Sequence, residues 1–95
     1  MLQVSFYQMT DAKLEALGIL QEECAELIQI ASKIRRFGEN DIYFGTSIKD
    51  RFIREIGDVL ALICMVQNLY LISKEEIDLA IDRKFEKLQK YSNLK

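Results

Sequence analysis

No proline occurs anywhere in the 95-residue chain. Proline removes a backbone donor and interrupts helices, so its absence leaves long helices unbroken. Apolar residues recur at the spacing of amphipathic helices in three segments, at about 10–37, 47–70 and 73–91. A chain of this length suits one domain. The sequence therefore predicts an all-α fold, a helical bundle of three main helices in a single domain over residues 1–95.

The first predicted helix has recognisable signals at both ends. Thr10 or Asp11 can cap its start, and Gly38 follows its last turn, where glycine often ends a helix. The glycine-flanked stretch 38–47 is predicted to be a loop because it is polar and lacks a helical period. Residues 1–9 fit either an extended arm or a short extra turn.

The other two helices differ in how much of their surface is apolar. The third begins with the capping-box spacing of Ser73 and Glu76 and has one apolar face. The second is apolar almost all round from Ile56 to Ile72, which is typical of a helix buried on several sides. Three helices of this size cannot easily cover one of their own. We therefore expect a homodimer or homotetramer, with a four-helix-like core completed by oligomerisation.

Composition excludes several classes of function. The chain has no histidine, which rules out histidine-based nucleophile systems and histidine-ligated zinc. A net charge of −2 without a block of basic residues disfavours nucleic acid or an anionic membrane as partner. The longest apolar run is far shorter than the roughly 20 residues of a membrane span, and no secretory signal is recognisable. Cys24 and Cys64 lie in apolar patterns, which predicts buried free thiols and a cytoplasmic protein.

Four carboxylates interrupt the apolar stripes of the first two helices. Glu23 and Glu26 stand three apart on the first helix, and Glu55 and Asp58 stand three apart on the second. This spacing places each pair about one turn apart on one face, so that both pairs can face the same inter-helix space. Solvated surface positions and salt bridges to nearby arginines are the alternatives. Because unpaired buried carboxylates are costly and repel one another, a divalent cation would resolve the conflict. With oxygen ligands alone the expected ion is Mg²⁺, with Mn²⁺ as a possible substitute.

A glycine on the second predicted helix and two lysines on the third also stand out. Gly57 lies between Glu55 and Asp58, where it favours either a close helix–helix contact or the approach of a ligand. Lys84 falls within the apolar stripe of the third helix, and Lys87 lies about one turn further on. Lys84 can extend along an apolar surface to solvent or point inward to an anion. Two lysines near a carboxylate-bound metal would suit a polyphosphate.

Three segments together resemble a known enzyme family. The stretches Glu22–Glu26 (EECAE) and Glu55–Asp58 (EIGD) resemble the ExxE…ExxD signature of MazG-like, all-α nucleoside triphosphate pyrophosphohydrolases. Relatives in this superfamily include dimeric dUTPases, dCTP pyrophosphatases and phosphoribosyl-ATP pyrophosphatases. The stretch Ala80–Leu88 (AIDRKFEKL) resembles the third motif of the family. The resemblance covers residues 14–91, which is most of the chain.

The resemblance implies an activity and a set of roles. The activity is Mg²⁺-dependent hydrolysis of a nucleoside triphosphate to the monophosphate and pyrophosphate, in a helical bundle commonly completed by a second subunit. The four carboxylates named above would hold the metal. Glu22 and Glu23 would be catalytic, with Glu22 able to ligate a second ion or orient the attacking water. The residues expected to contact the phosphates or the sugar are Asp82, Lys84 and Lys87.

One alternative and one open question remain at the level of sequence. The alternative is a catalytically silent helical oligomer that binds a nucleotide or a protein partner, in which the carboxylates serve only as salt-bridge partners. The preferred base and sugar cannot be read from the sequence. The candidates to line a base pocket are Phe6, Tyr7, Gln8, Tyr43 and Phe44.

Overall fold

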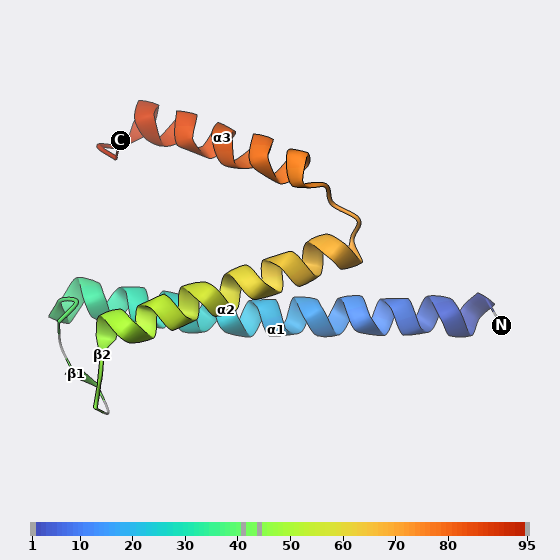
Figure 1. The fold of residues 1–95 in the computed structure, drawn as a ribbon, viewed down its shortest axis with the longest axis horizontal. Coiled ribbons are helices and arrows are strands. Elements are labelled where there is room, and N and C mark those ends of the chain that lie inside the picture. Colours follow the sequence, from blue (N-terminus) through green and yellow to red (C-terminus); the bar gives the residue numbers. More distant parts are fainter. Residues whose placement is uncertain (1, 41, 44, 95) are drawn as a thin grey trace.

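The computed structural model describes the backbone of residues 2–40, 42, 43 and 45–94, and the side chains of residues 11–40, 42 and 45–94. Within these ranges the chain forms three helices and two short strands of two residues each (Figure 1). The elements are α1 (Leu2–Phe37), β1 (Ile42–Tyr43), β2 (Thr46–Ser47), α2 (Ile48–Leu69) and α3 (Lys74–Tyr91). The predicted all-α fold is confirmed.

Helix α1 is longer than the sequence predicted. It begins at Leu2 and runs through Thr10 and Asp11, so the predicted start at either of these residues is wrong. No proline or glycine stands before Gly18, and nothing in this stretch therefore stops the helix from extending. A helix of 36 residues spans about 54 Å at 1.5 Å per residue. The longest dimension of the molecule is also 54 Å, so α1 sets its length.

The connection between α1 and α2 is a loop with a short antiparallel ladder. Gly38 has a positive φ of 88° and its N–H donates to the carbonyl of Ile34 at 2.8 Å, which ends α1 at the predicted place. Strands β1 and β2 then pair in antiparallel register. The Ser47 hydroxyl accepts from the N–H of Asp50 at 3.1 Å and caps α2. This loop reverses the chain, so that α2 runs back along α1.

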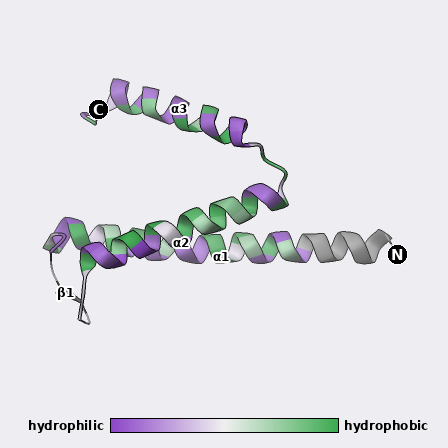
Figure 2. Ribbon diagram, in the orientation of Figure 1, coloured by the Kyte–Doolittle hydropathy of each residue, from purple (hydrophilic) through white to green (hydrophobic). Residues whose placement is uncertain are grey.

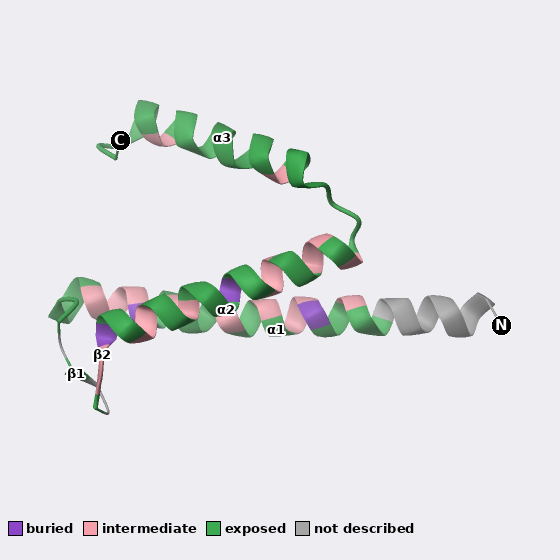
Figure 3. Cartoon of the chain, viewed as in Figure 1, coloured by how far each residue is buried: buried purple, intermediate pink, exposed green. Residues whose placement is uncertain are grey.

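Helices α1 and α2 form an antiparallel helical hairpin that contains the whole core of the described chain. Among the described side chains, the buried apolar residues come from α1 and α2, and no polar residue is buried (Figure 3). These residues are Ala16, Ile30, Ile48 and Val59. At the open end of the hairpin, the Lys13 ammonium lies 4.9 Å from the centre of the Tyr70 ring. The core therefore runs as a line between two helices, without a third layer.

Helix α3 leaves this hairpin and diverges from it (Figure 1). None of the described residues of α3 is buried. The radius of gyration is 17.3 Å, whereas a compact chain of 100 residues has about 13 Å. Apolar residues of α2 also stay uncovered, with Leu60 56% and Met65 54% exposed (Figures 2 and 3). The predicted burial of α2 on several sides is not found within a single chain, because α1 covers one side only.

The two cysteines are free, as predicted, but their predicted burial is wrong for one of them. Cys24 on α1 is half-buried, whereas Cys64 on α2 is exposed. Cys64 lies on the part of α2 that α1 does not cover. In the described part of the chain, no helix combines the length and the hydropathy needed to cross a bilayer.

The turn between α2 and α3 holds a leucine in a conformation that glycine usually adopts. The N–H of Ile72 donates to the carbonyl of Gln67 at 2.9 Å, and the N–H of Leu71 donates to that of Asn68 at 3.4 Å. This is the Schellman pattern, and it places Leu71 at a φ of 56°. A side chain in the left-handed region costs about 1–2 kcal/mol. Leu71 is 90% exposed, so no packing within the chain offsets that cost.

Replacing Leu71 with glycine is therefore expected to stabilise the protein. Leu71→Gly should raise the free energy of unfolding by about 1 kcal/mol, because glycine adopts positive φ without a steric penalty. Leu71→Ala is the matched control, since it removes the same side chain but keeps the Cβ that causes the strain. Urea unfolding followed by circular dichroism at one fixed protein concentration measures both. An equal gain from alanine would contradict the strain at this residue.

Candidate functional site

Three of the predicted metal ligands converge on one side of the α1–α2 hairpin. Glu23 and Glu26 project from successive turns of α1, and Glu55 projects from the first half of α2. One carboxylate oxygen from each of the three lies within 4.8 Å of the others. We call Glu23, Glu26 and Glu55 the acidic cluster. The i, i+3 spacing on α1 and the antiparallel pairing with α2 bring these side chains together.

Two carboxylate oxygens of the acidic cluster are shielded from solvent. One oxygen of Glu23 and one of Glu55, the Oε2 atom in each case, are buried and have no hydrogen-bond partner among the residues that the structure describes. Partial burial raises the pKa of Glu23, and the charges of Glu26, Asp58 and Glu22 raise it further. Partial burial likewise raises the pKa of Glu55, together with the charges of its acidic neighbours. Both pKa values are thus raised first by the partial loss of solvent around the carboxylates and then by the neighbouring negative charges.

The other two predicted acidic residues lie at the edge of the acidic cluster. Asp58 is exposed and falls outside the group of three oxygens, yet it is close enough to raise the pKa of both Glu23 and Glu55. Glu22 is exposed on α1 and raises the pKa of Glu23. The structure thus brings the five acidic residues predicted on the first two helices into one neighbourhood, with Asp58 and Glu22 at its exposed edge.

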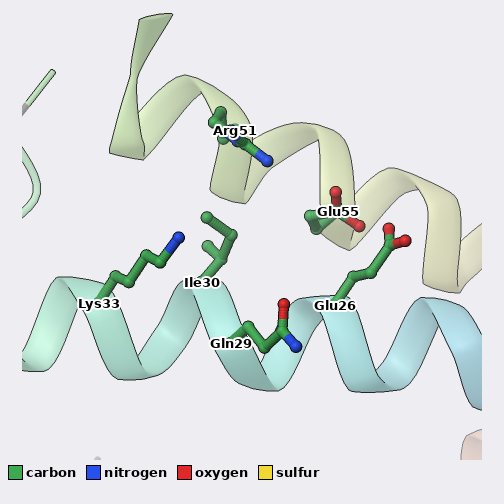
Figure 4. A pocket seen from close by; sticks show the side chains of 6 residues that line it. All are labelled: Glu26, Gln29, Ile30, Lys33, Arg51 and Glu55. Atoms are coloured by element: carbon green, nitrogen blue, oxygen red, sulfur yellow. The ribbon is translucent and has the colours of Figure 1, made fainter. Parts of the chain in front are cut away.

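A small cavity adjoins the acidic cluster and is lined by two basic side chains that were not predicted to belong to the site. The cavity has a volume of about 190 Å³ (Figure 4). It is lined by Glu26, Gln29, Ile30, Lys33, Arg51 and Glu55. In Figure 4 the carboxylates of Glu26 and Glu55 point toward one another, with Lys33 and Arg51 near the other end. The sequence spacing could have indicated both basic residues. Lys33 lies seven residues after Glu26 and Arg51 lies four residues before Glu55, so each shares a helix face with a residue of the acidic cluster.

The three residues predicted to contact the substrate are not brought to this cavity within the chain. Asp82, Lys84 and Lys87 are exposed on α3, which diverges from the hairpin (Figure 1). Lys84 and Lys87 instead line a shallow cavity on α3 alone, with Ala80 and Arg83. None of the groups that raise the pKa of Glu23 or Glu55 comes from α3. The carboxylates and the lysines therefore occupy separate surfaces of one chain.

Two other predictions about the site have different outcomes. A Cβ added at Gly57 would meet none of the described atoms within 4 Å, so the close helix–helix contact, one of the two interpretations of this glycine, is not found within the described chain. The residues proposed to line a base pocket have side chains outside the described part of the structure. They are Phe6, Tyr7, Gln8, Tyr43 and Phe44, and their role stays a prediction.

The chain matches no known protein family, no curated protein and no solved structure at a significant level. The resemblance to MazG-like pyrophosphohydrolases therefore rests on the three short segments quoted above. What the structure adds is the spatial arrangement of the acidic residues in two of those segments.

The raised pKa of Glu55, caused by partial burial and by neighbouring carboxylates, predicts that this carboxylate destabilises the metal-free protein at neutral pH. The folded state holds the proton of Glu55 more tightly than the unfolded chain, whose ordinary pKa is 4.5. As pH rises from that value through the raised pKa, the unfolded state loses its proton first and the free energy of unfolding falls. Glutamine carries no charge, so Glu55→Gln removes this loss of stability. The variant should therefore melt a few degrees above the unmodified protein at pH 7 with chelator present.

The same linkage predicts that the advantage of Glu55→Gln shrinks as pH falls toward 4.5, where the glutamate of both folded and unfolded chains becomes protonated. Thermal melts at pH 7 and at pH 4.5 test this. Glu15→Gln removes a carboxylate from an exposed position two turns before Glu23 and is the matched control. A Glu55→Gln variant that melts below the unmodified protein at pH 7 would show that the carboxylate is paired in the metal-free state.

Proposed function

We propose that the protein is a Mg²⁺-dependent nucleoside triphosphate pyrophosphohydrolase, which converts a ribo- or deoxyribonucleoside triphosphate to the monophosphate and pyrophosphate. The observation that carries this proposal is the acidic cluster, whose three carboxylate oxygens lie within 4.8 Å of one another. A cluster of this kind on two helices is what the motif resemblance implies. We further propose that the enzyme is cytoplasmic and works as a homodimer or homotetramer.

The acidic residues fit a hard divalent cation. All donors are carboxylate oxygens, the ligand type that Mg²⁺ and Mn²⁺ take. The buried Oε2 atoms of Glu23 and Glu55 have no hydrogen-bond partner among the described residues, so both are open to coordinate a cation. Glu23, Glu26, Glu55 and Asp58 are the proposed ligands. When bound, the cation would neutralise phosphate charge and lower the pKa of a coordinated water.

The remaining charged residues of the site suit a triphosphate. Attack of water on the α-phosphorus breaks the bond to the bridging oxygen, releases pyrophosphate and yields one proton. Glu22, at the solvent edge of the acidic cluster, is the proposed residue that orients this water and accepts its proton. Lys33 and Arg51 line the same cavity as Glu26 and Glu55, and their charges favour an anionic chain of phosphates there. No protein nucleophile is needed, which agrees with a chain without histidine.

A substrate panel tests the proposal directly. The purified protein is incubated with Mg²⁺ and each of the common ribo- and deoxyribonucleoside triphosphates, and pyrophosphate and nucleoside monophosphate are quantified. We expect equal amounts of both products from at least one substrate, and no reaction with excess chelator. Release of inorganic phosphate and diphosphate nucleotide would indicate a different bond cleavage. No product from any substrate would favour the silent helical oligomer instead.

A further inference from the structure

Helix α3 carries an apolar stripe that the α1–α2 hairpin does not cover. Ile77 and Leu88 are half-buried, whereas Ile81 and Phe85 are exposed, Phe85 by 60%. Helices of about this length are marginal in water by themselves, and in a folded protein they are held mainly by burial of such a stripe. Figure 2 shows apolar and polar bands alternating along α3. In the arrangement of Figure 1, α3 therefore gains little from packing.

The bend between α2 and α3 is held by hydrogen bonds of the turn itself. The N–H of Ile72 donates to the carbonyl of Gln67 at 2.9 Å, which belongs to the Schellman pattern at the end of α2. Ser73 and Glu76 form a reciprocal capping box at 2.8 and 3.1 Å. In a continuous helix the same N–H groups would donate to the carbonyls four residues earlier. No backbone donor of the turn would therefore lose its partner if the bend became straight.

Leu71 makes the bend costly. Its φ of 56° lies in the left-handed region, and its side chain is 90% exposed, so no packing within the described chain offsets the strain. In an α-helix φ is negative, and leucine is among the better helix formers. No glycine or proline stands after Gly57, so nothing in the sequence of the turn interrupts a helix. A straight helix would thus release strain that the bend retains.

The apolar stripes of α2 and α3 are in phase across the turn. On the side of α2 that faces α1, positions recur every three or four residues, and the same spacing runs without a break into the stripe of α3. These positions are Ile63, Val66, Tyr70, Ser73, Ile77 and Ile81. In one continuous helix such a spacing keeps to a single face. A straight α2–α3 helix would therefore present the stripe of α3 on the side on which α2 already packs against α1.

Helix α1 is long enough to receive this stripe. The Tyr70 ring lies 4.9 Å from the Lys13 ammonium at the open end of the hairpin, and α1 continues beyond that contact to Leu2 (Figure 1). At 1.5 Å per residue this free part of α1 is about 16 Å long. If the antiparallel pairing continued from the Tyr70 contact, Ile77 would come beside position 6 of the sequence and Ile81 beside position 2. Positions 2, 6 and 9 are apolar in the sequence and are spaced by four and three residues, as one helix face requires.

We propose that residues 70–73 form a two-state junction, at which the chain alternates between the bend of this structure and one continuous helix from Ile48 to Tyr91. In the straight state, Leu71 has a helical φ and the first turns of α3 pack along the N-terminal turns of α1. In the bent state the capping box is made, and the stripe of α3 is open to another surface. The junction therefore decides whether this stripe is covered within the chain. It does not depend on the function proposed above.

The distance between two spin labels distinguishes the two states. In a chain lacking Cys24 and Cys64, Leu60→Cys and Lys90→Cys carry the labels, because both positions are exposed. In a straight helix the thirty residues between them span about 45 Å. In the bend the distance is much shorter, because α3 runs back toward the start of α2 (Figure 1). Pulsed electron paramagnetic resonance on labelled chains diluted with unlabelled protein measures distances within one chain, and we expect both populations.

Two substitutions in the turn should shift these populations in opposite directions. Ser73→Ala removes the hydroxyl that caps α3 in the bend and should raise the ratio of long to short distances about fivefold. Leu71→Gly relieves the bend and weakens the helix, so it should abolish the long distance. Ser92→Ala removes a hydroxyl with similar local bonds at the other end of α3 and should leave the ratio unchanged. A single population in both the unmodified and the Ser73→Ala chains, or a ratio that neither turn variant changes, would overturn the proposal.

A further pair of variants tests the packing against α1. Ile77→Ser should lower the share of the long distance several-fold, because only the straight state buries this side chain. Leu79→Ser is the matched control, since Leu79 is 71% exposed and lies on a different face of α3. An equal effect of both substitutions would show that the long distance does not arise from a helix packed on α1, and would overturn that part of the proposal.

Discussion

Glu26→Gln is expected to lower Mg²⁺-dependent pyrophosphate release by at least about 100-fold while leaving the helices intact. Glu26, like Glu55 on α2, belongs both to the acidic cluster and to the lining of the adjoining cavity. The amide keeps the size of the side chain but removes its charge and one of its acceptor oxygens. Because Glu26 is exposed, little packing is lost and the fold should persist.

Steady-state rates measured with the best substrate of the panel provide the test, with circular dichroism to confirm helix content. Glu15→Gln removes an equivalent charge from an exposed position elsewhere on α1 and should keep nearly full activity. If Glu26→Gln retained the activity of this control, the acidic cluster would not be the metal site. A loss accompanied by loss of helix content would instead call for the same test on Asp58→Asn, which lies at the edge of the cluster.

Direct metal binding should show an effect of similar size. The protein should bind Mn²⁺ without nucleotide, and Glu23→Gln should weaken that binding by about 10- to 100-fold or more, since it removes a ligand. The Oε2 atom of Glu23 is buried and has no hydrogen-bond partner in the described part of the chain, so it is available as a ligand. Calorimetric titration, or the electron paramagnetic resonance of free Mn²⁺, measures the affinity.

The pH dependence of this binding follows from the raised pKa values of Glu23 and Glu55. Metal ligands must be deprotonated, so affinity falls as pH drops and the carboxylates take up protons. Because both pKa values lie above the ordinary 4.5, the fall should begin at a higher pH than for unperturbed carboxylates. In Glu55→Gln the affinity at pH 7 should be low and should change less with pH. Binding that is constant down to pH 4.5 in the unmodified protein would contradict carboxylate ligation by these residues.

Much of the fold could be predicted because helix ends are local features. The capping box of Ser73 and Glu76 starts α3 where the sequence predicted, and Gly38 ends α1 where predicted. The start of α1 was misplaced because Thr10 and Asp11 are good capping residues that the helix simply passes through. A capping residue is compatible with a helix start but does not require one. Because no proline stands upstream, the helix extends past Thr10 and Asp11.

The candidate site was predicted in part for the same reason. The i, i+3 pairs placed Glu23 with Glu26 and Glu55 with Asp58 on single faces, which depends on helical geometry alone. Which of these four come closest was decided by how α1 and α2 pack, with Ile30 and Val59 buried between them. That packing leaves Asp58 at the edge and brings Lys33 and Arg51 into the neighbouring cavity.

The sequence by itself determined three helices, their amphipathic faces and a concentration of acidic residues on two of them, because these follow from short-range spacing. Only the tertiary structure decided that the carboxylates of α1 and α2 share one site while the lysines of α3 lie apart from it. An apolar stripe shows that a helix has a face to bury, but not which surface buries it. For α3, only the structure shows that the helix diverges from the α1–α2 hairpin (Figure 1).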